Sequence, residues 1–280
     1  IELKNVNLFV EKGTTINFYN DAKWIVNNSE VYFNGVKERQ ISIHGNGNNS
    51  IFFNELKASN FTSVVFSGLS NYNDGCKSLP SAVTFYNSKV DLKDCTFKNN
   101  KVGDDILNVF QSEFTIDNCN FLNVFSDAID SDFSTGSITN TIFEEIGNDG
   151  VDCSGSVVTI DNSQFYKVSD KAISAGENSI MTVRNSSIKD SAIGFVSKDG
   201  SKLNISGTSK LVSNDLDFAV FTKKIFYDKP QLNISSSLNS FSYLIEKRSE
   251  IESLDVAKSL IYTQNVESKL YGKEYGKSSK

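Results

Sequence analysis

The sequence contains few of the residues on which several kinds of site depend. It has two prolines, one tryptophan, one methionine and one histidine, His44, in 280 residues. Its four cysteines show no Cys-x-x-Cys spacing, which argues against the usual zinc and redox motifs. His44 stands far from any candidate nucleophile, and no Ser/His/Asp arrangement accompanies it. A histidine-dependent mechanism is therefore not expected.

Long apolar runs and basic clusters are also missing. No apolar stretch approaches the roughly 18 residues of a transmembrane helix, so no membrane-spanning segment is expected. The net charge is −6, and lysine and arginine are scattered until the C-terminal tail, so we expect no nucleic-acid partner. The chain starts at Ile1 without an initiator methionine. We interpret it as a mature or trimmed form of an exported protein that is secreted, periplasmic or at the cell surface.

What the sequence does contain is a repeat of about 22 to 24 residues. Five segments align as VDLKDCTF (90–97), FTIDNCNF (114–121), GSITNTIF (136–143), VTIDNSQF (158–165) and MTVRNSSI (181–188). Each holds an apolar residue, then Asp or Asn two positions on, then a large apolar residue. A second short strand lies between successive segments, and its predicted inward residues are Leu107, Ile129, Val151, Ile173 and Ile193.

Alternation of apolar and polar residues, interrupted by Gly, Asn, Asp and Ser, predicts short strands rather than helices. One such unit cannot bury its apolar face alone, so the units must stack. The sequence therefore predicts an all-β fold, a right-handed parallel β-helix solenoid with coils of about 22 residues. We expect one domain, with less regular coils over 1–80, regular coils over 81–245 and a C-terminal cap or tail over 246–280.

The C-terminal segment changes character. Helical spacing there predicts a helix or capping segment over the open end of the solenoid, built from Ile251, Leu254, Val256, Leu260 and Ile261.

Polar residues at equivalent positions of the repeat predict ladders between coils. Asn118, Asn140, Asn162 and Asn185, with Asp94 at the first position, are interpreted as an internal ladder in which each amide bonds the backbone of the next coil. Cys95 and Cys119 also fall at equivalent positions on adjacent coils. They are close enough for a disulfide in principle, but the small residues that share their column favour buried free thiols.

Two acidic columns run through the second strand of the repeat. Asp105, Asp127 and Asp149 form one, and Asp130 and Asp152 form the other. At the spacing of parallel strands, about 4.8 Å, neighbouring carboxylates repel by about 0.9 kcal/mol even in water. Either a bound cation or raised pKa values would relieve this repulsion. Calcium fits such oxygen ligands, and these five aspartates are the predicted metal ligands, which Asp104, Asn108 and Asp132 extend. The alternative is that each aspartate bonds local backbone amides without any ion.

Charged residues near these columns are the remaining candidates. Lys171, with Asp149, is the predicted catalytic pair, in which the lysine acts as base or charge neutraliser; the alternative is a partly exposed ion pair. Glu177 and Lys198 are predicted to bind a glycan, and the alternative for both is solvated surface charge.

The coils from about 81 to 207 resemble the pectin lyase-like superfamily, which includes pectate, alginate and chondroitin lyases, polygalacturonases and epimerases. DKAISAGENS (170–179) resembles the strand of alginate and chondroitin lyases in which carboxylates hold calcium and a lysine acts as base. However, Gly176 and Glu177 stand where a lysine is expected, and no arginine follows. GDD (103–105) resembles the paired aspartates of polygalacturonases, whose Gly-His-Gly and Arg-Ile-Lys elements are absent.

This resemblance implies a carbohydrate-active protein. We therefore expect an exported β-helix that binds a polysaccharide, and that cleaves or modifies it in one reading, with calcium at the acidic columns. The alternative is a non-catalytic structural, adhesin or coat module in which an aspartate column stabilises the coils. The sugar and the oligomeric state stay open.

Overall fold

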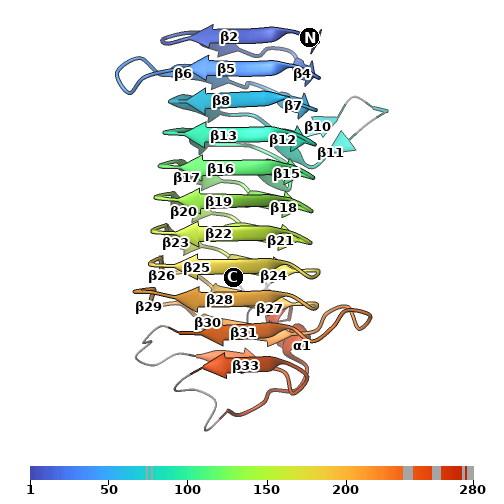
Figure 1. Cartoon of the computed structure of the whole chain (residues 1–280), viewed down its shortest axis with the longest axis vertical. Helices are drawn as coiled ribbons and strands as arrows, with labels where there is room; N and C mark the ends of the chain where they lie inside the picture. The colour runs from blue at the N-terminus through green and yellow to red at the C-terminus, as the bar shows by residue number, and fades with distance from the viewer. Residues whose placement is uncertain (74, 77, 236–241, 254–259, 273–274, 276–280) are drawn as a thin grey trace.

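The computed structural model describes residues 1–73, 75–76, 78–235, 242–253, 260–272 and 275. In these residues the chain winds into a stack of coils, and each regular coil contributes one strand to each of three long parallel sheets (Figure 1). Hydrogen-bonded positions of neighbouring coils lie 22 to 24 residues apart in the regular part. The predicted parallel β-helix and its repeat length are confirmed.

Sheet 1 carries the acidic columns on its strands β15, β18 and β21, except for Asp149, which lies just before β21. Its strands, in the order in which they pair within the described residues, are β1 (Glu2–Lys4), β4 (Lys23–Asn27), β7 (Ser50–Asn54), β12 (Ser81–Tyr86), β15 (Asp105–Phe110), β18 (Asp127–Asp132), β21 (Val151–Ser154), β24 (Lys171–Gly176), β27 (Ile193–Lys198), β30 (Leu216–Phe221) and β32 (Tyr243–Ile245). Between β7 and β12 the chain makes a short antiparallel hairpin of β10 (Tyr72–Asn73) and β11 (Ser78–Leu79), so the offset between coils there is 32 residues.

Sheets 2 and 3 form the other two sides of the stack. Sheet 2 contains β2 (Asn7–Glu11), β5 (Glu30–Asn34), β8 (Ala58–Thr62), β13 (Lys89–Lys93), β16 (Glu113–Asp117), β19 (Thr135–Thr139), β22 (Val157–Asp161), β25 (Ile180–Arg184), β28 (Lys202–Ser206), β31 (Gln231–Ile234) and β33 (Glu250–Ser253). Sheet 3 contains β3 (Thr15–Asn17), β6 (Ile41–His44), β9 (Val64–Ser67), β14 (Thr96–Lys98), β17 (Asn120–Val124), β20 (Ile142–Ile146), β23 (Gln164–Val168), β26 (Ser187–Lys189) and β29 (Lys210–Val212).

The predicted inward residues of sheet 1 are mostly correct. Leu107, Ile129, Val151 and Ile173 pair in register and are fully buried in the core. The prediction for Ile193 is wrong, because Phe195 pairs with Ile173 and takes the inward position.

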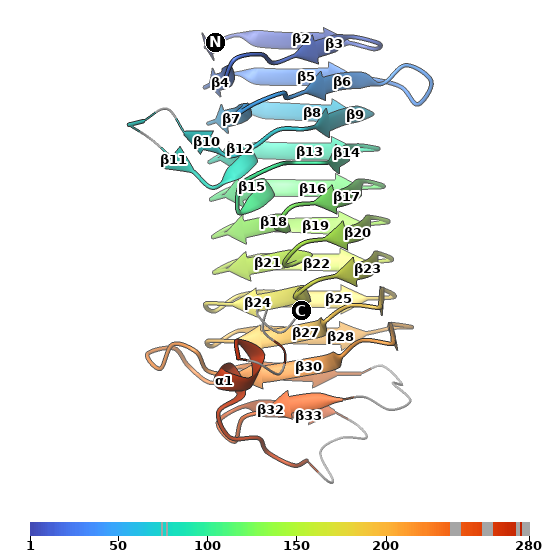
Figure 2. The same cartoon turned by 180° about the vertical axis from the view of Figure 1, so that it is seen from behind.

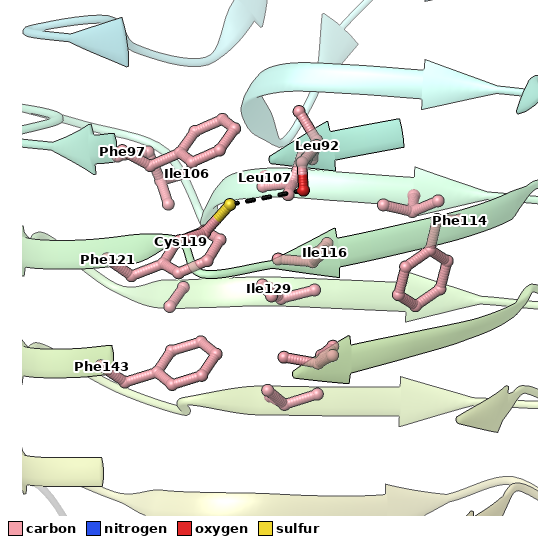
Figure 3. Packing of buried hydrophobic residues seen from close by; sticks show 14 of the residues in the cluster. Leu92, Phe97, Ile106, Leu107, Phe114, Ile116, Cys119, Phe121, Ile129 and Phe143 are labelled. Carbon is pink, nitrogen blue, oxygen red and sulfur yellow. Dashed lines mark hydrogen bonds between the residues drawn. The ribbon is translucent and has the colours of Figure 1, made fainter. Parts of the chain in front are cut away.

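The large apolar residue that ends each repeat forms a column of stacked rings inside the solenoid. Phe66, Phe97, Phe121, Phe143 and Phe165 stack in succession with centroids 4.4 to 5.0 Å apart. Figure 3 shows Phe97, Phe121 and Phe143 one above another, beside the aliphatic residues of the other two sheets. Because each ring belongs to a different coil, this column joins successive coils.

The asparagines form a ladder between coils, but the predicted interior position and the predicted backbone partners are wrong. Asn118, Asn140, Asn162 and Asn185 are exposed, and their amides bond side chains of the preceding coil. They have φ near +50°, the left-handed conformation that asparagine tolerates best after glycine, so they turn the chain outside the core. The internal ladder is made by the residues that follow them: Cys95, Cys119, Thr141, Ser163 and Ser186, whose backbone N–H groups each donate to the side chain of the next member.

A second internal ladder, which the sequence reading missed, follows sheet 1. Backbone N–H groups donate to the serine hydroxyl of the next coil along Ser88, Ser112, Ser134, Ser156, Ser179 and Ser201. These bonds satisfy backbone donors at the buried corner between sheets 1 and 2. Cys95 and Cys119 are buried free thiols, as predicted.

The C-terminal prediction is partly wrong. Residues 250–253 form β33 instead of a helix, while Leu254 and Val256 lie outside the described residues. A short helix, α1 (Val266–Leu270), packs its buried Val266 and Leu270 against the outer face of sheet 1 near β30. Figure 2 shows α1 on the side of the stack from which β10 and β11 also project. The outer face of sheet 1 carries the apolar residues Val196, Ala219 and Leu244 there, which explains why α1 packs at this place. No helix in the described ranges is long and apolar enough to cross a membrane.

We expect Phe143→Ala to lower the free energy of unfolding by about 3 to 5 kcal/mol, because it removes a fully buried ring between two others. Chemical denaturation would measure this loss. Phe125→Ala, at an exposed ring, is the matched control and should change stability by less than about 0.5 kcal/mol. Equal losses in the two variants would contradict a stabilising role for the ring column.

Candidate functional site

Two clefts lie on the outer face of sheet 1. They adjoin where β18 and β21 pair, because Asp132 lines one cleft and Asp152, on the neighbouring strand, lines the other. The register explains how residues far apart in sequence meet there. One outward column runs Thr84, Asn108, Asp130, Asp152 and Ser174, and another runs Tyr86, Phe110, Asp132 and Ser154.

The first cleft, here called the acidic cleft, has a volume of about 480 Å³. It is lined by Asp104, Asp127, Asn148, Asp149, Asp152, Asp170, Lys171, Lys198, Lys223, Leu270 and Tyr271. Carboxylates and ammonium groups of six coils therefore converge on one hollow, and the C-terminal segment adds Leu270 and Tyr271 to its lining. Such a concentration of ionisable groups is typical of a functional site rather than of a solvated surface.

Three carboxylates at one end of this cleft have the arrangement of a cation site. One oxygen each of Asp104, Asp105 and Asp127 lies within 4.8 Å of the others. Asp105 is almost fully buried, and neither of its carboxylate oxygens has a hydrogen-bond partner. Buried oxygens without donors fit a hard cation such as calcium, which takes oxygen ligands in flexible geometry.

The other predicted metal ligands have different surroundings. Asp149 accepts hydrogen bonds from the backbone and side chain of Lys171, and Asp152 lies 3.6 Å from the ammonium of Lys198. Asp127 accepts the backbone N–H of Asp149 at 2.8 Å. The backbone-bonding alternative thus describes Asp127 and Asp149, but not Asp105.

Burial and mutual repulsion change the titration of these carboxyls. Burial, then the charge of Asp149, raises the pKa of Asp127 to about 8. Burial raises the pKa of Asp105 well above its usual range, and Asp127 adds to the effect. Burial, then Asp105, does the same to the pKa of Asp130. Burial also raises the pKa of Asp149 to about 6, although the charge of Lys171 opposes the increase. Raised pKa values, the second way considered above to relieve the repulsion, are thus found for four carboxyls of the columns.

Lys171 forms a buried ion pair, not the partly exposed pair considered from the sequence. Its ammonium lies 3.1 Å from both oxygens of Asp149 and 2.7 Å from Asp170. Burial alone would lower its pKa, but Asp149 and Asp170 outweigh burial and raise it well above the usual range. Lys171 is therefore a fixed cation in this arrangement.

Lys198 is also buried, so the solvated-charge alternative is wrong for it. Its side chain lies across Gly176 of the preceding coil, where a Cβ atom would stand 2.6 Å from Lys198 Cε. Glycine at 176 thus leaves room for Lys198 to reach Asp152. Glu177 is half-buried, accepts a hydrogen bond from Ser154 and pairs with Lys224.

The second cleft, here called the aromatic cleft, has a volume of about 710 Å³ and continues the face toward β1. Tyr72 and Leu79 of the hairpin form one wall, and Phe52, Tyr86 and Phe110 of sheet 1 contribute rings. Tyr86 and Phe110 stack at 5.4 Å between centroids. Asn27 and Asn54, joined by a hydrogen bond of 3.0 Å, add amide groups.

The sequence analysis identified the acidic residues. It did not identify the aromatic cleft, nor Lys223 and Tyr271 of the acidic cleft. Tyr86 and Phe110 occupy equivalent positions of adjacent coils, two residues after the Asn108 column, and this spacing was a usable signal. Lys223 and Tyr271 gave no such signal, because they reach the acidic cleft from outside the regular repeat.

Comparisons with known proteins agree with the fold. Residues 105–214 match the family model described as a right handed beta helix region, in agreement with the predicted handedness. No curated protein matches the chain.

Similar solved structures include an alginate lyase from Paenibacillus sp. strain FPU-7, with 10% identity, a TM-score of 0.41 and coverage of 88% of this chain and 90% of that one. A Dettilon tailspike protein shows 9% identity and a TM-score of 0.47 over 90% and 61% of the two chains. Pectate lyase Pel9A shows 12% identity and a TM-score of 0.44 over 92% and 82%.

In EDTA, we expect the melting temperature to fall as pH rises from about 5 to about 8.5. The folded state retains a proton on Asp127 that the unfolded chain releases above about pH 4. The stability contributed by this proton is thus complete below about pH 4 and is lost as pH rises through about 8. Asp127→Asn, which keeps the oxygen that accepts the Asp149 N–H, should flatten the dependence and raise the melting temperature at the alkaline end.

Asp91→Asn is the control, since it removes one exposed carboxylate from sheet 2 without touching the cleft. Thermal unfolding followed by circular dichroism gives the pH profiles. If Asp127→Asn and Asp91→Asn had the same profile, Asp127 would not be the titrating group.

Proposed function

We propose that this right-handed β-helix binds a polysaccharide along the outer face of sheet 1, over the aromatic and acidic clefts. The observation that carries the proposal is their continuity. Stacked rings and amides lie on one side, and carboxylates and ammonium groups lie on the other. Aromatic faces pack against the apolar faces of sugar rings, and amides and carboxylates bond their hydroxyls.

The shape of the site favours a polymer over a small molecule. The two clefts together extend from β1 to the strands near α1, so a ligand that filled both would cross most coils of the stack. A linear glycan lying along the coil axis would meet repeated groups in register, because each outward column repeats its position from coil to coil.

We further propose that calcium binds Asp105, Asp127 and Asp104, with Asp130 nearby. Unpartnered buried oxygens of Asp105 and the mutual repulsion of the carboxyls support this site. Calcium, when bound, would neutralise a uronate carboxylate and acidify the adjacent C–H proton. Asp149 and Asp152 would pair with Lys171 and Lys198 rather than bind calcium directly. The proposed set of calcium ligands is therefore smaller than the five aspartates predicted from the sequence.

The catalytic roles of Lys171 and Asp149 stay predictions. Between Asp149 and Asp170, Lys171 fits the role of charge neutraliser, because both carboxylates hold its proton. For Lys171 to act as a base, its ion pair with Asp149 or with Asp170 must first break, so that its pKa can fall. Glycan binding does not depend on turnover, and the non-catalytic alternative differs in having no polysaccharide ligand at these clefts.

To test glycan binding, we would measure affinities for pectate, alginate, chondroitin, dextran and xylan by isothermal titration calorimetry. At least one polymer should bind, and Tyr86→Ala with Phe110→Ala should weaken it by about tenfold or more, since both rings would lose contact area. Phe9→Ala with Tyr32→Ala is the matched control, because it removes an equivalent stacked pair, at 5.2 Å, from sheet 2. Failure of every polymer to bind would favour the structural module.

To test the cation site, we would record thermal unfolding in EDTA and then with excess calcium. A ligand that binds only the folded state at about 100 times its dissociation constant adds about 2.7 kcal/mol, or about 5 °C or more in this size range. Asp105→Asn with Asp127→Asn should remove this rise, whereas Asp91→Asn should keep it. A rise that survives the double substitution would place calcium elsewhere.

A further inference from the structure

The groove formed by the two clefts is blocked at one end. Past Ser174, the outward column of sheet 1 continues as Val196, Ala219 and Leu244. All three are buried in a cluster with Val266 and Leu270 of α1. The outer face that is available to a ligand at β15 and β18 is thus covered by protein at β27 and β30.

Tyr271, directly after α1, forms the end wall. Its ring packs edge-on against Phe221 with centroids 6.5 Å apart, which fixes it on sheet 1. The ammonium groups of Lys171 and Lys223 lie 5.7 Å and 4.8 Å from the ring centroid. Leu270 and Tyr271 both line the acidic cleft, so the C-terminal segment closes it. On the other side, the aromatic cleft continues toward β1.

The cations at the closed end differ in what they already bind. Lys171 pairs with Asp149 and Asp170, and Lys198 pairs with Asp152. Lys223 is exposed, and within the described part of the chain its ammonium contacts the Tyr271 ring with no carboxylate at ion-pair distance. Among the described residues at the blocked end, Lys223 is therefore the cation without a carboxylate partner, and a ligand anion can reach it.

Resting on the proposed polysaccharide function, we propose that the closed end of the groove recognises the terminal residue of an acidic glycan. The chain would leave over the aromatic cleft, and the carboxylate of its last uronate residue would pair with Lys223 beside Tyr271. A groove walled at one end by α1 and Tyr271 accepts a chain end there and leaves no room for a chain to continue past it. The protein would thus act at the ends of uronate polymers.

The stoichiometry of binding to chains of different length tests this directly. We would take the uronate polymer that binds in the panel, prepare a short and a long fraction of known mean length, and titrate each by calorimetry. Recognition of ends predicts the same number of protein molecules per chain for both fractions. Recognition of chain interiors predicts a number that rises in proportion to length.

The outcomes separate this inference from the function on which it rests. A proportional rise would overturn end recognition and leave polysaccharide binding intact. Binding to dextran or xylan alone would overturn the acidic ligand, again without loss of the broader function. No binding to any polymer would overturn both.

A charge substitution tests the assigned cation. Lys223→Gln should weaken binding of the short uronate fraction by about tenfold or more, because it removes a charge-assisted contact. Lys202→Gln, an exposed lysine on β28 of sheet 2, is the matched control and should bind as the parent does. Equal affinity of Lys223→Gln and the parent would overturn the role of Lys223.

Discussion

The structure depends on a constant strand register from one coil to the next, and extra residues such as the β10–β11 hairpin enter between strands. A coil of 22 to 24 residues returns the chain to the same position on the sheet below, so every column repeats its side-chain type and its hydrogen bonds. The stacked phenylalanines and the two internal ladders all require this return. One extra residue within a strand would turn the inward side chains of that strand outward and break the column that passes through it.

The same regularity creates the tension at the site. The repeat that stacks rings in sheet 3 also stacks carboxylates in sheet 1, Asp105 beside Asp127 and Asp130 beside Asp152. The molecule offsets this repulsion in different ways along the column. Lys171 and Lys198 lie against Asp149 and Asp152, whereas burial and mutual repulsion raise the pKa values of Asp105 and Asp127 and favour their protonated forms. The part of the column without lysine partners is therefore the part that can respond to a ligand.

The repeat made the fold predictable, because a period of this length has few physical solutions. The register also allowed the acidic residues to be aligned between coils, because Leu107, Ile129 and Val151 were correctly predicted to point inward. Prediction was weaker where a residue's role depends on backbone conformation. The asparagines were assigned to the interior because they repeat, but their left-handed φ places them outside. It also missed Lys223, Tyr271 and the hairpin, whose positions follow from tertiary contacts rather than from the period.

The contact between Gly176 and Lys198 makes one residue's contribution conditional on another that lies one coil away. A side chain at 176 would occupy the space of Lys198 Cε and force the ammonium away from Asp152. The position of the Lys198 ammonium beside Asp152 thus depends on the residue at 176, so the effects of substitutions at 176 and 198 are expected to be coupled between neighbouring coils.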